Sequence, residues 1–184
     1  MHKIILILLL TCLSLSCNKW VDPKPVTDPR LTNPYCNDPT AVNYNWGFPG
    51  KPDNTVCFYP TDMFAGRFLF IDSIYSESGL NFGNFLYALT DTLSVTTLSH
   101  TKMTIAGFCS TGSIMKLTAL TFTATVDTTV GDTLTTTQGQ LLCRTKDTVY
   151  GTIFYSRTDS LLHINFQVMS DTGLSSHVGK ARKL

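Results

Sequence analysis

The chain has 184 residues, a formal net charge of +1 and 43% hydrophobic residues, enough for one ordinary domain with appended segments. A near-neutral chain with scattered basic residues lacks the electrostatic footprint of a nucleic-acid-binding protein. It also has no polybasic patch for anionic lipid. Composition therefore argues against nucleic acid as a partner.

The N-terminus begins MHKIILILLL. His2 and Lys3 form a short positive region, and the apolar run that follows is too short to cross a bilayer stably in the mature protein. Helical periodicity and caps are absent, which argues against the alternative of an ordinary buried N-terminal helix. The run predicts a signal peptide over residues 1–16.

The signal ends at Ser16, directly before Cys17. A small residue before a cysteine at this point resembles the signal of bacterial lipoproteins, in which the cysteine is acylated, for example with palmitate, and becomes the first residue. Ser14 and Leu15 depart from the usual aliphatic and small residues, but looser boxes of this kind resemble those of Gram-negative bacteria rich in surface lipoproteins. The resemblance implies a membrane anchor at Cys17 in the cell envelope, most simply at the outer membrane. Plain secretion with a free thiol is the alternative.

Four cysteines remain beyond the predicted lipid site. An even number in an exported chain predicts two disulfides, and four cysteines permit three connectivities. We favour Cys36 with Cys57, because this pair closes a compact local loop, and Cys109 with Cys143. Separate buried thiols at the last two positions are the alternative.

Residues 17–35 contain four prolines. Proline removes backbone donors and keeps its neighbour extended, so this segment is expected to be a lipid-anchored tether without helix or strand.

Residues 36–60 form a turn-rich segment between two cysteines. CNDPTAVNYN followed by DNTVC resembles a short repeat of exported proteins from the same bacteria, with the form Cys-Thr-Asp-Pro-x-Ala-x-Asn-Tyr-Asn and then Asp-Asp-Gly-Ser-Cys. The middle is longer here, and the last motif is changed. The resemblance covers about 25 residues and supports a disulfide-closed turn module.

The turn module also offers oxygen ligands that calcium prefers, at Asp38, Asn43 and Asp53. Two carboxylates make a weak site, and the spacing differs from an EF-hand loop. The alternative is that these side chains cap their own backbone in Asx-turns.

Residues 61–184 carry the period-2 pattern of half-buried strands. In LLHINFQV, residues 161–168, the apolar side chains alternate with polar ones. Short runs joined by tight turn signals predict an all-β fold, an antiparallel meander of about eight strands that closes into a small barrel. The predicted strands are 67–75, 85–95, 102–105, 114–120 continuing through 121–126, 138–146, 149–157, 161–168 and 176–183.

The β region opens with Phe64-Ala65-Gly66-Arg67-Phe68. In the exported proteins mentioned above, a Phe-x-Gly-x-Tyr start often follows the repeat, and this opening with a meander is similar to lipocalin-like barrels. The resemblance implies a barrel and carries over no ligand.

Motifs for chemistry are missing from the sequence. His100, His163 and His177 are far apart, and no zinc, phosphate-loop or nucleophile-elbow pattern occurs. The acids are expected mostly at strand ends or turns, solvated, and His163 on a solvent-facing strand surface. We therefore expect no enzyme, no cofactor and no metal.

Two functions fit these features. The leading one is non-catalytic binding of a small apolar molecule or a glycan through the barrel domain. The alternative is a structural or protein-interaction role with a solid barrel and no ligand cavity. Aromatic side chains are expected mostly in the core, because large rings dominate burial.

The anchor is tested by Cys17→Ser. Without the thiol no acyl chain can be attached, so the variant is expected in the soluble fraction while the wild type sediments with membranes. A variant that still sediments with membranes contradicts the assignment.

Overall fold

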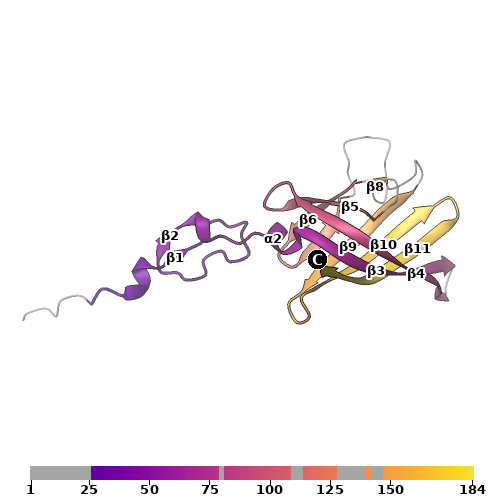
Figure 1. Cartoon of the computed structure of the whole chain (residues 1–184). Coiled ribbons are helices and arrows are strands. Elements are labelled where there is room, and N and C mark those ends of the chain that lie inside the picture. The colour runs from indigo at the N-terminus through magenta and orange to yellow at the C-terminus, as the bar shows by residue number, and fades with distance from the viewer. Residues whose placement is uncertain (1–25, 79–80, 109–113, 128–139, 142–146) are drawn as a thin grey trace, which may run out of the picture.

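The computed structural model describes residues 26–78, 81–108, 114–127, 140–141 and 147–184. A slender N-terminal segment leads through the short helix α2 (Pro60–Phe64) into a β-barrel (Figure 1). The predicted signal peptide and Cys17 lie outside the described residues, and so do Cys109 and Cys143.

Eight of the described strands form a closed antiparallel barrel, which confirms the predicted all-β fold and the strand number. They follow one another in chain order, and the pairing of β11 with β3 completes the ring. A ninth strand of two residues pairs with β9 on the same side as β7. The strands are β3 (Gly66–Ser78), β4 (Asn81–Thr97), β5 (Lys102–Ala106), β6 (Ile114–Leu120), β7 (Thr123–Val126), β8 (Gln140–Leu141), β9 (Thr148–Ser156), β10 (Leu161–Ser170) and β11 (Gly173–Lys183).

Apolar side chains of the described strands pack together inside the barrel. On β10 the predicted alternation is confirmed, since every second residue from Leu162 to Val168 is buried. Met63 and Phe64 of α2 close one end of this core. Each fully buried large side chain contributes about 1.5–3 kcal/mol relative to exposure. The largest fully buried ones include Phe70, Phe166, Leu93, Met103, Ile105, Met115, Leu117, Ile153, Leu162 and Ile164.

One strand prediction needs correction, and another lies mostly outside the described residues. The run 114–126 is not continuous, because β6 and β7 form a tight hairpin in which Leu120 pairs with Thr123. Its turn contains Thr121 at a φ of 48°, a conformation for which glycine or asparagine is the usual signal. The turn was not predicted because threonine is not a usual turn signal at such a position. Of the predicted strand 138–146, only Gln140–Leu141 is described, as β8.

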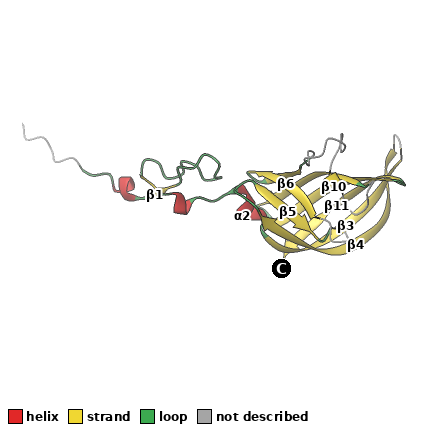
Figure 2. Cartoon of the chain, turned by 90° about the horizontal axis from the view of Figure 1, so that it is seen from above, coloured by secondary structure: helices red, strands yellow, loops and turns green. Residues whose placement is uncertain are grey.

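Strand β4 is much longer than its neighbour β5. It pairs with β3 along most of its length, but β5 pairs only with residues 94–97. Within the described ranges, residues 81–93 have no ladder partner on the β5 side (Figure 2). Phe85, Leu86, Tyr87 and Leu89 are about half exposed in this stretch.

The turn module is closed by the predicted disulfide. Cys36 and Cys57 are bonded, with their Cα atoms 4.8 Å apart. A short parallel pair, β1 (Pro34–Tyr35) with β2 (Lys51–Pro52), and a 3₁₀ turn at Asn54–Val56 complete it.

Order begins earlier than the predicted boundary at residue 36. The expected irregular tether contains a 3₁₀ turn at Pro29–Thr32, where Asp28 accepts a hydrogen bond from the Arg30 amide at 2.9 Å. Tyr35 of β1 is buried and packs edge-on against Phe48. The carboxylate of Asp28 and the buried ring of Tyr35 therefore give this segment local structure. The proline content alone had predicted an extended segment.

The module and the barrel meet at Tyr59. Its ring stacks on His100 with centroids 3.5 Å apart, and its hydroxyl donates to Asp38 at 3.0 Å. The next residues start α2, where the buried Thr61 hydroxyl donates to the carbonyl of Ser99 at 3.0 Å. The hairpin between β4 and β5 therefore holds the module against one end of the barrel.

The separateness of the two parts is tested by Cys36→Ser/Cys57→Ser. Losing a loop closure of this size removes about 3 kcal/mol of constraint, which is expected to fall on the module. Hydrogen exchange should rise across residues 36–57 and stay unchanged in β10 and β11, and reduced wild type should match the variant. Loss of protection throughout the barrel would show that the module is part of its folding unit.

Candidate functional site

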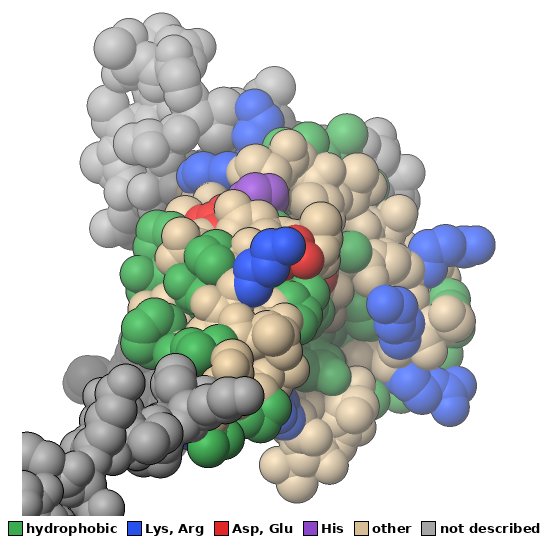
Figure 3. Space-filling view, turned by 90° about the vertical axis from the view of Figure 1, so that its left-hand side faces the viewer, with side chains coloured by type: hydrophobic (Ala, Val, Ile, Leu, Met, Phe, Trp, Pro, Cys, Tyr) green, Lys and Arg blue, Asp and Glu red, His purple; other side chains and the backbone are tan. Residues whose placement is uncertain are grey.

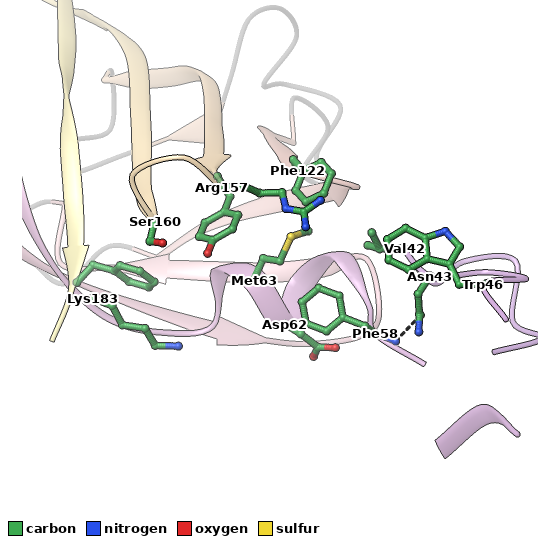
Figure 4. A pocket seen from close by; sticks show the side chains of 12 residues that line it. Val42, Asn43, Trp46, Phe58, Asp62, Met63, Phe122, Arg157, Ser160 and Lys183 are labelled. Carbon is green, nitrogen blue, oxygen red and sulfur yellow. Dashed lines mark hydrogen bonds between the residues drawn. The ribbon is translucent and has the colours of Figure 1, made fainter. Parts of the chain in front are cut away.

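A hollow of about 620 Å³ lies where the turn module meets the α2 end of the barrel. We call it the interface groove. Module residues form one wall and barrel residues the other (Figure 4), and the same end of the molecule shows apolar side chains beside scattered basic ones (Figure 3). Its lining consists of Val42, Asn43, Trp46, Phe58, Asp62, Met63, Phe68, Phe122, Tyr155, Arg157, Ser160 and Lys183.

The module wall is held rigidly by Asn43. Its side-chain oxygen accepts from the Phe58 amide at 2.7 Å, and its side-chain nitrogen donates to the Val56 carbonyl at 2.8 Å. The Trp46 amide in turn donates to the Asn43 carbonyl at 3.1 Å. These bonds present Trp46 and Phe58 to the groove, where they remain 63% and 41% exposed.

The opposite wall comes from the β6–β7 turn and the end of β9. The Tyr155 amide donates to the Phe122 carbonyl at 2.8 Å, which fixes the turn to the strand. The guanidinium of Arg157 lies over the Phe122 ring, 5.6 Å from its centroid. Such a contact orients the cation while leaving its N–H donors available.

Lys183 at the end of β11 reaches the groove across Gly66. A Cβ built on Gly66 would lie 2.9 Å from the Lys183 Cε, and Gly66 has a φ of 130°. Glycine is therefore needed at this position both for the backbone conformation and for the passage of the lysine stem.

The carboxylate in the groove, Asp62, already has a structural task. It accepts a hydrogen bond from the Tyr59 amide at 2.7 Å at the start of α2. Within the described residues, neither the Arg157 side chain nor the Lys183 side chain forms a salt bridge or a hydrogen bond. The groove thus holds two uncommitted cations beside one committed anion.

The three calcium candidates all form hydrogen bonds within the turn module. Asp38 accepts from the Thr40 amide at 2.9 Å, and Asp53 accepts from the Thr55 amide at the same distance. Hydrogen bonds from Thr40 hold the pKa of Asp38 below its ordinary value. Asp38 and Asp53 therefore behave as the Asx-turn alternative predicts, whereas Asn43 bonds the backbone of the distant residues Val56 and Phe58.

A polar cluster lies inside the barrel, near the middle of β3 and β11. The expectation that the acids lie at strand ends or turns is wrong for Asp72, which is buried within β3. One of its oxygens lies 2.6 Å from His177 Nδ1, and the other has no partner in the described structure. His177 Nε2 lies 3.3 Å from the Ser175 hydroxyl.

This cluster could not be recognised from sequence spacing. Asp72 and His177 are 105 residues apart and meet only because β3 pairs with β11. The available signal covers only Asp72, which alternates with Phe70 and Ile74, whereas His177 shares its face of β11 with Ser175 and Gly179. His163, by contrast, lies on the outer face as predicted, 3.0 Å from Asp159.

Comparison with protein-family models, with curated proteins and with solved structures found no match to this chain. No helix in the described ranges has the length and apolar character needed to cross a membrane.

Asp91 offers a test of the interior electrostatics. Burial, and then the charge of Asp72, raise the pKa of the Asp91 carboxyl. An acid whose pKa is higher in the folded state destabilises the fold above that pKa, and this penalty vanishes below its ordinary value of 3.8. Asp91→Asn should therefore raise the melting temperature at neutral pH and lose this advantage well below pH 3.8.

Asp72→Asn is the matched comparison. It removes the anionic acceptor of His177, so we expect it to lower the melting temperature at neutral pH. A destabilised Asp91→Asn variant would show that the Asp91 charge is compensated in the fold.

Proposed function

We propose that this protein is a non-catalytic lipoprotein of the cell envelope that binds a glycan in the interface groove. The anchor and the location at the outer membrane follow from the N-terminal run and Cys17. The binding function follows from the lining of the groove.

The observation that carries the proposal is the exposure of Trp46 and Phe58 on a hollow of about 620 Å³. Large rings left in water on a concave surface favour a ligand that covers them. Sugar rings present apolar C–H faces that pack on aromatic rings, and hydroxyls that need polar partners. Ser160 and Arg157 offer such partners on the opposite wall.

The groove is a better site than the barrel interior. A carrier of a small apolar molecule would enclose its ligand in a cavity lined by apolar side chains. The described interior is instead filled by residues such as Phe70 and Phe166. The filled barrel serves as a rigid support, and the ligand is taken up outside it.

Binding without catalysis is favoured by the surroundings of the polar cluster of Asp72, His177 and Ser175. These three residues resemble, in this order, the orienting acid, the base and the nucleophile of a hydrolase. The backbone of β11 beside Ser175 is paired with β10 on one side and β3 on the other, so its amides are engaged in the ladders. A hydrolase needs free amides or other donors to stabilise an oxyanion.

A second candidate function, protein contact, is favoured by the unpaired stretch of β4. An exposed strand edge with half-exposed apolar side chains is a template for pairing with another chain. In this case the outer surface of the barrel contacts the partner protein, which is the protein-interaction alternative derived from the sequence.

The glycan proposal is tested with Trp46→Ala on an array of neutral and acidic oligosaccharides, followed by calorimetry with the best binder. Removing one aromatic contact of about 1.4 kcal/mol weakens binding about tenfold. Tyr44→Ala is the matched control, because Tyr44 is an exposed ring of the same module outside the groove.

Equal losses in the two variants, or binding unaffected by Trp46→Ala, would contradict the groove as the site. A protein that binds no glycan on the array but self-associates in sedimentation would favour the second candidate.

A further inference from the structure

We infer that the glycan bound in the interface groove is acidic, and that Arg157 and Lys183 recognise its carboxylate groups. This inference rests on the proposed function and names the class of its ligand. It is carried by the position and the freedom of the two cations.

The two cations belong to the barrel wall of the groove and lie across from the module (Figure 4). Both side chains are exposed, so their charge is available to a ligand. Two positive charges and one carboxylate leave the lining with a net charge of +1 from Arg157, Lys183 and Asp62. The field in the groove therefore favours an anion.

The freedom of these cations contrasts with the pairing of two other basic residues of the barrel. Lys180, on the same strand as Lys183, lies 3.5 Å from Asp159, and Lys102 lies 3.1 Å from Asp127. Asp159, next to the groove residue Ser160, is occupied by Lys180 and His163. No carboxylate among the described residues pairs with Arg157 or Lys183, so a ligand would supply the missing anion.

The two cations are also held in place before any ligand arrives. Arg157 rests on the Phe122 ring, and the stem of Lys183 lies across Gly66. A guanidinium so placed can form paired hydrogen bonds to a carboxylate, whereas an ammonium acts as a point charge. Preorganised groups lose less side-chain entropy on binding.

The remaining lining agrees with a charged sugar rather than a fatty acid. The aromatic rings Trp46 and Phe58 lie on the module wall, opposite the cations. A sugar ring carrying a carboxylate would place its apolar face on the rings and its charge on the cations. A fatty acid would need a long enclosed apolar channel, which the filled barrel does not provide.

The test uses tetramers of galacturonic, mannuronic and guluronic acid together with their carboxyl-reduced, neutral counterparts. We expect at least one acidic tetramer to bind and its neutral counterpart to bind about tenfold more weakly. Binding of the acid should also weaken between roughly 0.05 and 0.5 M NaCl, because exposed charges are screened.

Arg157→Gln/Lys183→Gln should remove both the preference for the acid and most of the salt dependence. Arg182→Gln is the matched control, because Arg182 precedes Lys183 on β11 and is exposed but does not line the groove. Unchanged melting temperatures show that each variant is folded.

Three outcomes overturn the inference. Equal binding of acidic and neutral tetramers, or binding of neutral glycans only, refutes acid recognition and leaves the groove a glycan site. Acid binding that survives the double substitution assigns the charge recognition elsewhere. Absence of binding to every glycan on the array refutes the proposed function itself.

Discussion

The interface groove depends on the contacts of Tyr59. Its ring stacks on His100 of the β4–β5 hairpin, its hydroxyl donates to Asp38 in the turn module, and its amide donates to Asp62 at the start of α2. One residue therefore joins the module, the helix that closes the barrel, and the barrel wall. Because the walls of the groove belong to different parts of the chain, its shape is only as well defined as this junction.

The filled barrel and the exposed groove divide two tasks. Residues that pack the interior, such as Phe166 and Leu93, stabilise the fold. The end closed by Met63 and Phe64 then offers a firm base for the turn module. A binding wall on a small module, ordered by a disulfide and by Asn43 rather than by a large core, can change its exposed residues with little cost to the barrel.

The sequence was sufficient for the fold class because period-2 alternation reports burial directly. The alternating run of β10 and the pairing of Cys36 with Cys57 were both predicted from local pattern. The groove was not predicted, since its walls are far apart in the chain and no local motif records that Trp46 and Arg157 line the same hollow. The hairpin turn at Thr121 was missed for another reason, because a threonine occupies a left-handed conformation that turn rules assign to glycine or asparagine.

Several carboxylates of the described chain pair with a basic side chain, whereas the two cations of the groove have no such partner. Asp28 binds Arg30, Asp127 binds Lys102, and Asp159 binds Lys180. Even the buried Asp72 is paired on one oxygen with His177. Two positioned cations without a carboxylate partner, on a concave aromatic surface, form the lining expected of a site completed by an anionic ligand. Exposed surface pairs contribute little to stability, so leaving these cations unpaired costs the fold little and reserves their charge for binding.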